Sequence, residues 1–178
     1  GAMPGSPHDK LFKAVFSEPE NAAAHFETCL PAALVRALDL GNARHVAGSW
    51  VDEAMKGHHS DVAHAIPFRA STTRESPGKS LLLYTIFEHQ STIEAFMALR
   101  AHRYTTRLLE EWSREHPGEP LPPVMVLVLY HGDPEWTAPQ ELQELFDLDD
   151  LAPETRVALA PYLPKMRYFL EVVPPELS

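Results

Sequence analysis

The chain lacks the features that several protein classes require. It contains one cysteine among 178 residues, Cys29, which excludes an internal disulfide framework and a zinc site built from several cysteines. Its longest apolar run, Val124–Tyr130, is far shorter than the roughly 18 residues that a membrane-spanning helix needs. No secretory signal is evident, and we expect residues 1–6 to be a cleavage remnant followed by a flexible lead-in. These observations favour a cytoplasmic protein with no membrane partner.

Positive charge is also scarce, with 15 Lys and Arg residues against 25 Asp and Glu residues, for a formal net charge of −10. Residues 1–134 hold 16 acidic and 12 basic side chains, whereas residues 135–178 hold nine acidic and three basic ones. This balance argues against tight binding to nucleic acid by electrostatics alone. An enzyme that gathers carboxylates around a cation can still act on a phosphate substrate. We predict a core over residues 7–134 and an acidic C-terminal extension, residues 135–178, packed on it.

The hydrophobic pattern predicts an α/β fold. Helical spacing extends from Asp9 to Leu40, and Ser91 with Glu94 forms a capping box for a long helix that ends near His116. Strands are predicted at His45–Glu53, Asp61–Phe68, Leu81–Phe87, Val124–Tyr130 and Arg167–Val173, and short helical stretches at residues 139–150 and 154–164. A helix between the third and fourth strands implies a crossover connection. We therefore expect helices on both faces of a mixed central sheet.

Two carboxylates occur where a buried strand normally carries none. Asp61 begins the second predicted strand, and Glu88 follows the apolar third strand, with Gln90 on the same face because side chains alternate along a strand. If these strands are neighbours, Asp61 can lie beside Glu88. Paired carboxylates suit Mg²⁺ or Mn²⁺, which favour oxygen ligands. The alternative interpretation is a strand-end cap beside a solvated turn.

The spacing resembles that of the PD-(D/E)xK nuclease superfamily, and several short motifs resemble one of its families, the Rpn recombination-promoting nucleases, often described as putative transposases. The motifs lie between residues 7 and 134, and they are Pro7–Lys13, Gly48–Trp50, Ser60–Val62, Phe87–Ser91, Arg103–Tyr104 and Leu129–Gly132. Each motif is weak alone, but their order along the chain is specific. The resemblance implies a restriction-endonuclease-like αβββαβ core.

The resemblance also implies a function in bacteria. It predicts a Mg²⁺-dependent or Mn²⁺-dependent DNA endonuclease linked to recombination, mobile elements or phage defence, with Asp61 and Glu88 as metal ligands and Gln90 completing the catalytic set. Gln90 stands where the wider superfamily usually has Lys, and a neutral amide supplies no positive charge to the transition state. A nuclease-like module that is silent or autoinhibited, or an RNA endonuclease, remains an alternative. A homodimer also remains open.

Other polar clusters have two interpretations each. Arg100, Arg103 and Arg107 follow one another at helical spacing and are predicted to contact DNA phosphates, the alternative being a solvated face paired with neighbouring acidic residues. His58, His59, Asp61 and His64 suggest a zinc cluster at first sight. In a strand, however, His64 faces away from Asp61, so we expect His64 to pack in the core.

Overall fold

A mixed five-stranded sheet organises the chain in the computed structural model, which describes residues 14–46, 61–69, 78–88, 93–132 and 134–173. The strands are β1 (Arg44–His45), β2 (Val62–Pro67), β3 (Ser80–Glu88), β4 (Val124–Tyr130) and β5 (Phe169–Val172), and they lie in the sheet in that order. Neighbours are antiparallel from β1 to β3 and parallel from β3 to β5. The mixed sheet that the pattern predicts is therefore confirmed.

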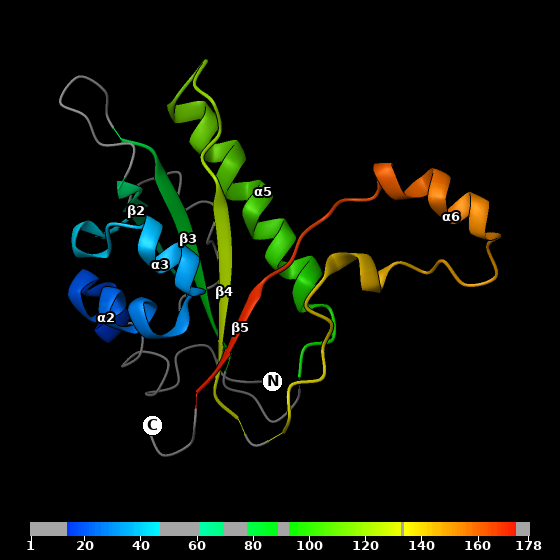
Figure 1. Cartoon of the computed structure of the whole chain (residues 1–178), viewed down its shortest axis with the longest axis horizontal. Coiled ribbons are helices and arrows are strands. Elements are labelled where there is room, and N and C mark those ends of the chain that lie inside the picture. Colours follow the sequence, from blue (N-terminus) through cyan, green and yellow to red (C-terminus); the bar gives the residue numbers. More distant parts are fainter. Residues whose placement is uncertain (1–13, 47–60, 70–77, 89–92, 133, 174–178) are drawn as a thin grey trace.

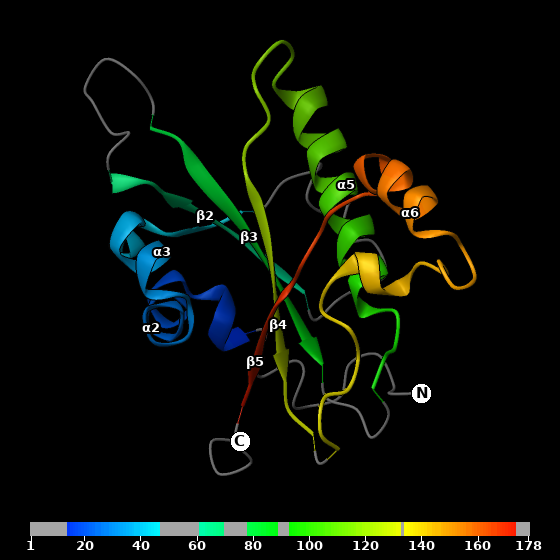
Figure 2. The same ribbon diagram turned by 45° about the vertical axis from the view of Figure 1, so that its right-hand side comes forward.

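Helices cover both faces of the sheet (Figure 1). One face carries α2 (Pro19–Cys29), α3 (Ala32–Ala37) and the short helix η1 (Leu40–Asn42), and the other carries α5 (Met97–Glu115) with η3 (Leu142–Leu145). Figure 2 shows the sheet between α2 and α3 on one side and α5 on the other. Within the described part of the chain, no helix combines the length and apolar character that crossing a bilayer requires.

The N-terminal helices follow local signals. Pro19 stands in the first turn of α2, where its missing N–H costs no hydrogen bond, and Pro31 separates α2 from α3. Phe26 is fully buried against the sheet.

The predicted start of the helical region at Asp9 lies outside the described residues. The strand predicted at His45–Glu53 is described only at its beginning, where β1 ends at His45.

The long helix α5 begins later than its predicted cap. The capping box placed its start at Ser91, but the first helical residue is Met97, and the N-cap position is Phe96 without a side-chain hydrogen bond. Ser91 itself lies outside the described residues. Glu94 instead turns its carboxylate to Arg100, so its side chain is not used to cap the helix. The predicted start was wrong: the Glu94 side chain pairs with Arg100, and the helix begins three residues after Glu94, at Met97.

The helix α5 packs on the sheet through side chains that recur at helical spacing. Its buried residues are Met97, Ala98, Ala101, Tyr104 and Leu108, which form one stripe along the helix. This stripe packs on Ala63, Tyr84, Ile86, Val126 and Val128 of the sheet. The first turns of α5 therefore lie close to the end of β3, where Glu88 is located.

The C-terminal segment supplies the fifth strand. Leu127 to Tyr130 of β4 pair with Phe169 to Val172 of β5 in parallel. Tyr168 is fully buried, and its hydroxyl accepts a hydrogen bond from Trp136 Nε1 at 3.0 Å and donates one to the carbonyl of Pro139 at 2.9 Å. Between these anchors, α6 (Pro153–Leu159) and η4 (Ala160–Tyr162) project from the body (Figure 1). The domain boundary at residue 134 stays a prediction.

Candidate functional site

Asp61 and Glu88 lie on one face of the β2–β3 pair. Val62 stands opposite Thr85 and Ala63 opposite Tyr84, so the register continues from Asp61 to Ile86, two residues before Glu88. Alternation then directs the side chains of Tyr84, Ile86 and Glu88 to the face that α5 covers. Asp61 is fully buried and Glu88 is 4% exposed. The sequence analysis assumed that the second and third predicted strands are neighbours, and the pairing of β2 with β3 confirms it.

The guanidinium of Arg100 connects the two carboxylates. Its Nη1 lies 2.7 Å from Glu88 Oε1 and 2.9 Å from Glu94 Oε2, and its Nη2 lies 3.8 Å from Asp61 Oδ2. The Arg100 side chain is only 13% exposed. Buried ion pairs of this kind persist only when several hydrogen bonds satisfy the charges, and the planar guanidinium can make them in several directions. We call Asp61, Glu88, Glu94 and Arg100 the acidic site.

Two tyrosines complete the hydrogen bonds of the acidic site. The Tyr84 hydroxyl donates to Asp61 Oδ2 at 2.7 Å, and Arg100 Nε donates to the Tyr104 hydroxyl oxygen at 2.8 Å. Burial, together with the charge of Asp61, raises the pKa of Tyr84 above its ordinary value, so Tyr84 stays a protonated donor. Burial opposes the charge on Arg100, but Asp61, Tyr104 and Glu88 outweigh it and raise the pKa of Arg100. The guanidinium therefore remains charged.

The chemistry of these ligands fits a hard cation. Asp61 and Glu88 offer only carboxylate oxygens, which Mg²⁺ and Mn²⁺ prefer. Among the described residues, no group of three or more His, Cys, Asp or Glu side chains is arranged to hold a metal ion. Mg²⁺ is commonly bound through one or two carboxylates and keeps several waters.

The other predicted site residues lie in different environments. Gln90 lies outside the described residues. Arg103 and Arg107 are exposed on α5, and the guanidinium carbon of Arg103 is 5.5 Å from the centre of the Tyr104 ring. Arg100 does not share their exposure, because it turns inward to the carboxylates. Contacts of these arginines with DNA remain predictions.

Sequence reasoning did not find three partners in the acidic site. Tyr84 lies in the apolar strand run, and its separation of four residues from Glu88 is the signal that both share a face. Tyr104 follows Arg100 by four residues, which is one helical turn. The side chain of Glu94 was assigned to helix capping alone. In each case the residue spacing was visible. The pairing of Tyr84 depended on the β2–β3 register, and the pairings of Tyr104 and Glu94 with Arg100 depended on the inward turn of Arg100.

His64 lies on the sheet face opposite to Asp61, as strand alternation predicts. It is fully buried, and its ring packs edge-on against Phe26 with centroids 5.5 Å apart. Burial, with a smaller contribution from the charge of His45, lowers the pKa of His64 from 6.5 to about 4. His64 is therefore a neutral core residue near pH 7, whereas His58 and His59 lie outside the described residues.

This buried histidine predicts a loss of stability in acid. The unfolded chain binds the proton below its pKa of 6.5, whereas the folded chain resists it until about pH 4. The contribution of His64 to the free energy of unfolding should fall by about 2 to 3 kcal/mol between pH 7 and pH 4.5. Urea denaturation at both pH values should show a smaller decrease for His64→Leu than for the native chain. An equal decrease would contradict the assignment, and His102→Leu on α5 serves as the control.

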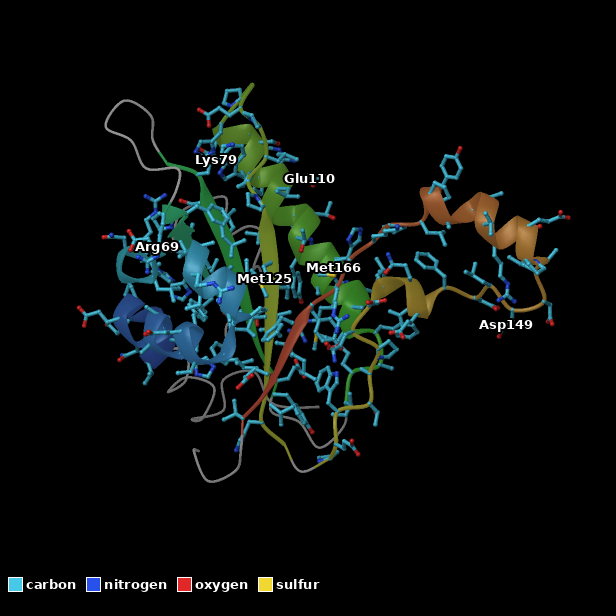
Figure 3. The ribbon with its side chains drawn as sticks, in the orientation of Figure 1. Arg69, Lys79, Glu110, Met125, Asp149 and Met166 are labelled. Atoms are coloured by element: carbon cyan, nitrogen blue, oxygen red, sulfur yellow. The ribbon has the colours of Figure 1, made fainter. Side chains whose placement is uncertain are left out.

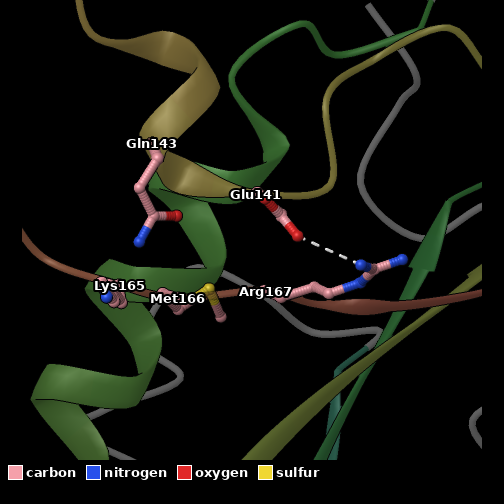
Figure 4. A pocket seen from close by; sticks show the side chains of 5 residues that line it. All are labelled: Glu141, Gln143, Lys165, Met166 and Arg167. Atoms are coloured by element: carbon pink, nitrogen blue, oxygen red, sulfur yellow. Dashed lines mark hydrogen bonds and ion pairs between the residues drawn. The ribbon is translucent and has the colours of Figure 1, made fainter.

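Chemical groups away from the acidic site are less suited to catalysis. A surface hollow lies beside η3 and the segment leading into β5, lined by Glu141, Gln143, Lys165, Met166 and Arg167 (Figure 4). Its Glu141 carboxylate and Arg167 guanidinium pair with each other at 3.1 Å. Burial raises the pKa of the Cys29 thiol to about 12, so it is not a nucleophile near neutral pH. The acidic site is therefore the candidate active centre.

The layered α/β fold, with paired carboxylates at the end of a strand, is consistent with the restriction-endonuclease-like core that the motifs imply. The family described as "Putative transposase, YhgA-like" matches residues 6–172. The chain belongs to this family, and its curated relatives include the Rpn recombination-promoting nucleases.

Individual relatives include both nucleases and inactive proteins. Recombination-promoting nuclease RpnD of Escherichia coli O157:H7 is 33% identical over 71% of this chain and 46% of its own length, and RpnC of E. coli K12 is 30% identical over 72% and 40%. The putative inactive recombination-promoting nuclease-like protein YjiP of E. coli K12 is 34% identical over 58% of this chain and 93% of its own length. The chain thus spans less than half the length of RpnD and RpnC. No solved structure matches it.

Proposed function

We propose that the chain is a metal-dependent DNA endonuclease that hydrolyses phosphodiester bonds. The observation that carries this proposal is the acidic site itself, in which Asp61 and Glu88 from neighbouring strands meet on one buried face. A charged pair in such a place is costly to bury and adds little to stability compared with apolar residues. The chain belongs to a family with relatives named recombination-promoting nucleases, and this membership supports a catalytic role for the pair in recombination.

Asp61 and Glu88 would hold Mg²⁺ or Mn²⁺ and fix its position relative to the sheet. When bound, the cation neutralises phosphate charge and lowers the pKa of a bound water. Tyr84 orients Asp61 by donating a hydrogen bond to Oδ2. Gln90 would orient the water or a phosphate oxygen, because its amide both donates and accepts hydrogen bonds.

A silent nuclease-like module is the second candidate function. Two observations favour it. The relative YjiP, matched over 93% of its own length, is named a putative inactive nuclease-like protein. Arg100 of this chain already contacts Asp61, Glu88 and Glu94. In this alternative, the ion pairs would stabilise a binding protein and no cation would be needed. An RNA endonuclease is a third reading, because nothing in the acidic site selects the sugar.

The proposal is tested with the native chain and three cofactor conditions: Mg²⁺, Mn²⁺ and EDTA. Supercoiled plasmid is expected to be nicked and then linearised with either metal and to stay intact with EDTA. An RNA duplex of matched sequence, assayed in parallel, is expected to stay intact. A folded protein that cuts neither substrate would favour the silent module, and cutting of RNA alone would replace DNA as the substrate.

A further inference from the structure

Arg100 occupies the place where a cation would meet the carboxylates. Its Nη1 lies 2.7 Å from Glu88 Oε1, and the same nitrogen lies 2.9 Å from Glu94 Oε2. Its other terminal nitrogen faces Asp61 Oδ2. The guanidinium therefore already supplies a positive charge that offsets part of the negative charge of this buried pair.

A divalent cation and this guanidinium compete for the same two carboxylates. Mg²⁺ binds carboxylate oxygens at about 2.0–2.1 Å and requires near-octahedral geometry around itself. A metal ion so close to Glu88 Oε1 would lie within a few ångströms of Arg100 Nη1, and repulsion between like charges is strong in a buried site. We therefore expect a cation held by both carboxylates to displace Arg100 from Glu88 and Asp61.

The structure gives Arg100 partners that it can keep after this release. Glu94 is more exposed than the other two carboxylates, with 36% of its side chain accessible against 4% for Glu88. Nε of Arg100 is held independently by the Tyr104 hydroxyl oxygen. A guanidinium that keeps Glu94 and Tyr104 remains beside the metal ligands, on the more accessible side of the site.

We propose that Arg100 exchanges partners: its guanidinium pairs with Asp61 and Glu88 before a divalent cation binds, and it contacts a phosphate oxygen of the substrate once the cation holds those carboxylates. This inference rests on the proposed nuclease function. It assigns to a helix residue the positive charge that the neutral Gln90 does not supply. Guanidinium groups suit this role because they bind carboxylate and phosphate oxygens with the same planar geometry.

The first test measures binding of Mn²⁺ by isothermal titration calorimetry. Arg100→Gln removes the competing charge and keeps a polar side chain, so Mn²⁺ should bind about tenfold more tightly than to the native chain. Arg114→Gln is the matched control, because it removes the same charge from the exposed last turn of α5. Its affinity for Mn²⁺ should equal that of the native chain. Unchanged or weaker binding by a folded Arg100→Gln variant would overturn the exchange.

The second test measures plasmid cutting at saturating Mn²⁺. Arg100→Gln should cut about a hundredfold more slowly although it binds metal more tightly, and Arg100→Lys should recover part of the rate. A native rate for Arg100→Gln would overturn the phosphate contact. If Arg100→Gln does not fold, Arg100→Lys still tests the competition. Lysine lacks the rigid fork that reaches Glu88, Glu94 and Asp61 together, so it should hold the carboxylates less firmly and Mn²⁺ should again bind more tightly.

The outcomes separate this inference from the proposed function. Native protein that binds Mn²⁺ and cuts DNA, without any gain on Arg100→Gln, contradicts only the exchange. Native protein that binds Mn²⁺ and cuts nothing contradicts the nuclease assignment, while the affinity comparison still decides the competition between Arg100 and metal. Absence of Mn²⁺ binding in both proteins contradicts both.

Discussion

Replacing Asp61 with Asn is expected to slow metal-dependent plasmid cutting by at least about a thousandfold, equivalent to about 4 kcal/mol of transition-state stabilisation. The amide keeps the size of the carboxylate and can still accept the hydrogen bond from Tyr84. It removes the negative charge that would hold the cation, and a bound cation is worth several kcal/mol to phosphate chemistry. Glu88→Gln should have an effect of the same order, measured as initial rates of nicking at fixed Mg²⁺.

The control for these variants is Glu110→Gln. Glu110 is exposed on α5 (Figure 3), ten residues along the helix beyond Arg100. Its loss of charge equals that of Glu88→Gln, and we expect a native cutting rate. Circular dichroism and thermal melting establish that each variant is folded. A folded Asp61→Asn protein that cuts at the native rate would show that the active centre lies elsewhere or that a contaminant cuts the plasmid.

Replacing Phe26 with Ala is expected to lower the free energy of unfolding by about 3 to 5 kcal/mol. Phe26 is fully buried where α2 meets the sheet, with its ring 5.8 Å from that of Phe16 and 5.5 Å from that of His64. The substitution leaves a cavity between a helix and a sheet whose backbones cannot collapse fully onto it. Urea denaturation, monitored by far-ultraviolet circular dichroism, measures the change.

Val157→Ala on α6 is the comparison for the Phe26 variant. Val157 is 73% exposed on the projecting segment, so its truncation removes little buried apolar surface. Its effect on the free energy of unfolding should stay within about 0.5 kcal/mol. A small effect at Phe26, similar to that at Val157, would contradict the packing of α2 on the sheet.

The strands were predictable because burial on both faces leaves a clear signal. Val124–Tyr130 was predicted with the bounds that β4 has, and the run at Leu81–Phe87 matches β3 to within one residue at each end. Both strands lie in the middle of the sheet and are covered by helices on either side, which requires an uninterrupted apolar run. The edge strands are short and less apolar, so β5 (Phe169–Val172) is shorter than its predicted range.

The acidic site was only partly predictable. The positions of Asp61 and Glu88 at strand ends gave the carboxylate pair, because strand alternation and neighbouring strands are local properties. The inward turn of Arg100 was not accessible from the sequence, since three arginines at helical spacing look alike until the docking of α5 is known. Packing of Met97, Ala101 and Tyr104 on the sheet fixes the rotation of the helix and brings Arg100 to the carboxylates.

Anomalous diffraction from crystals soaked in Mn²⁺ tests the central claim most directly, because it locates the cation without relying on an activity assay. We predict a peak within coordination distance of both the Asp61 and Glu88 carboxylates, with the Arg100 guanidinium moved off them. The peak should be lost in Asp61→Asn crystals. A peak at another site, or a native chain that cuts DNA with these carboxylates still paired to Arg100 in the soaked crystal, would contradict the account.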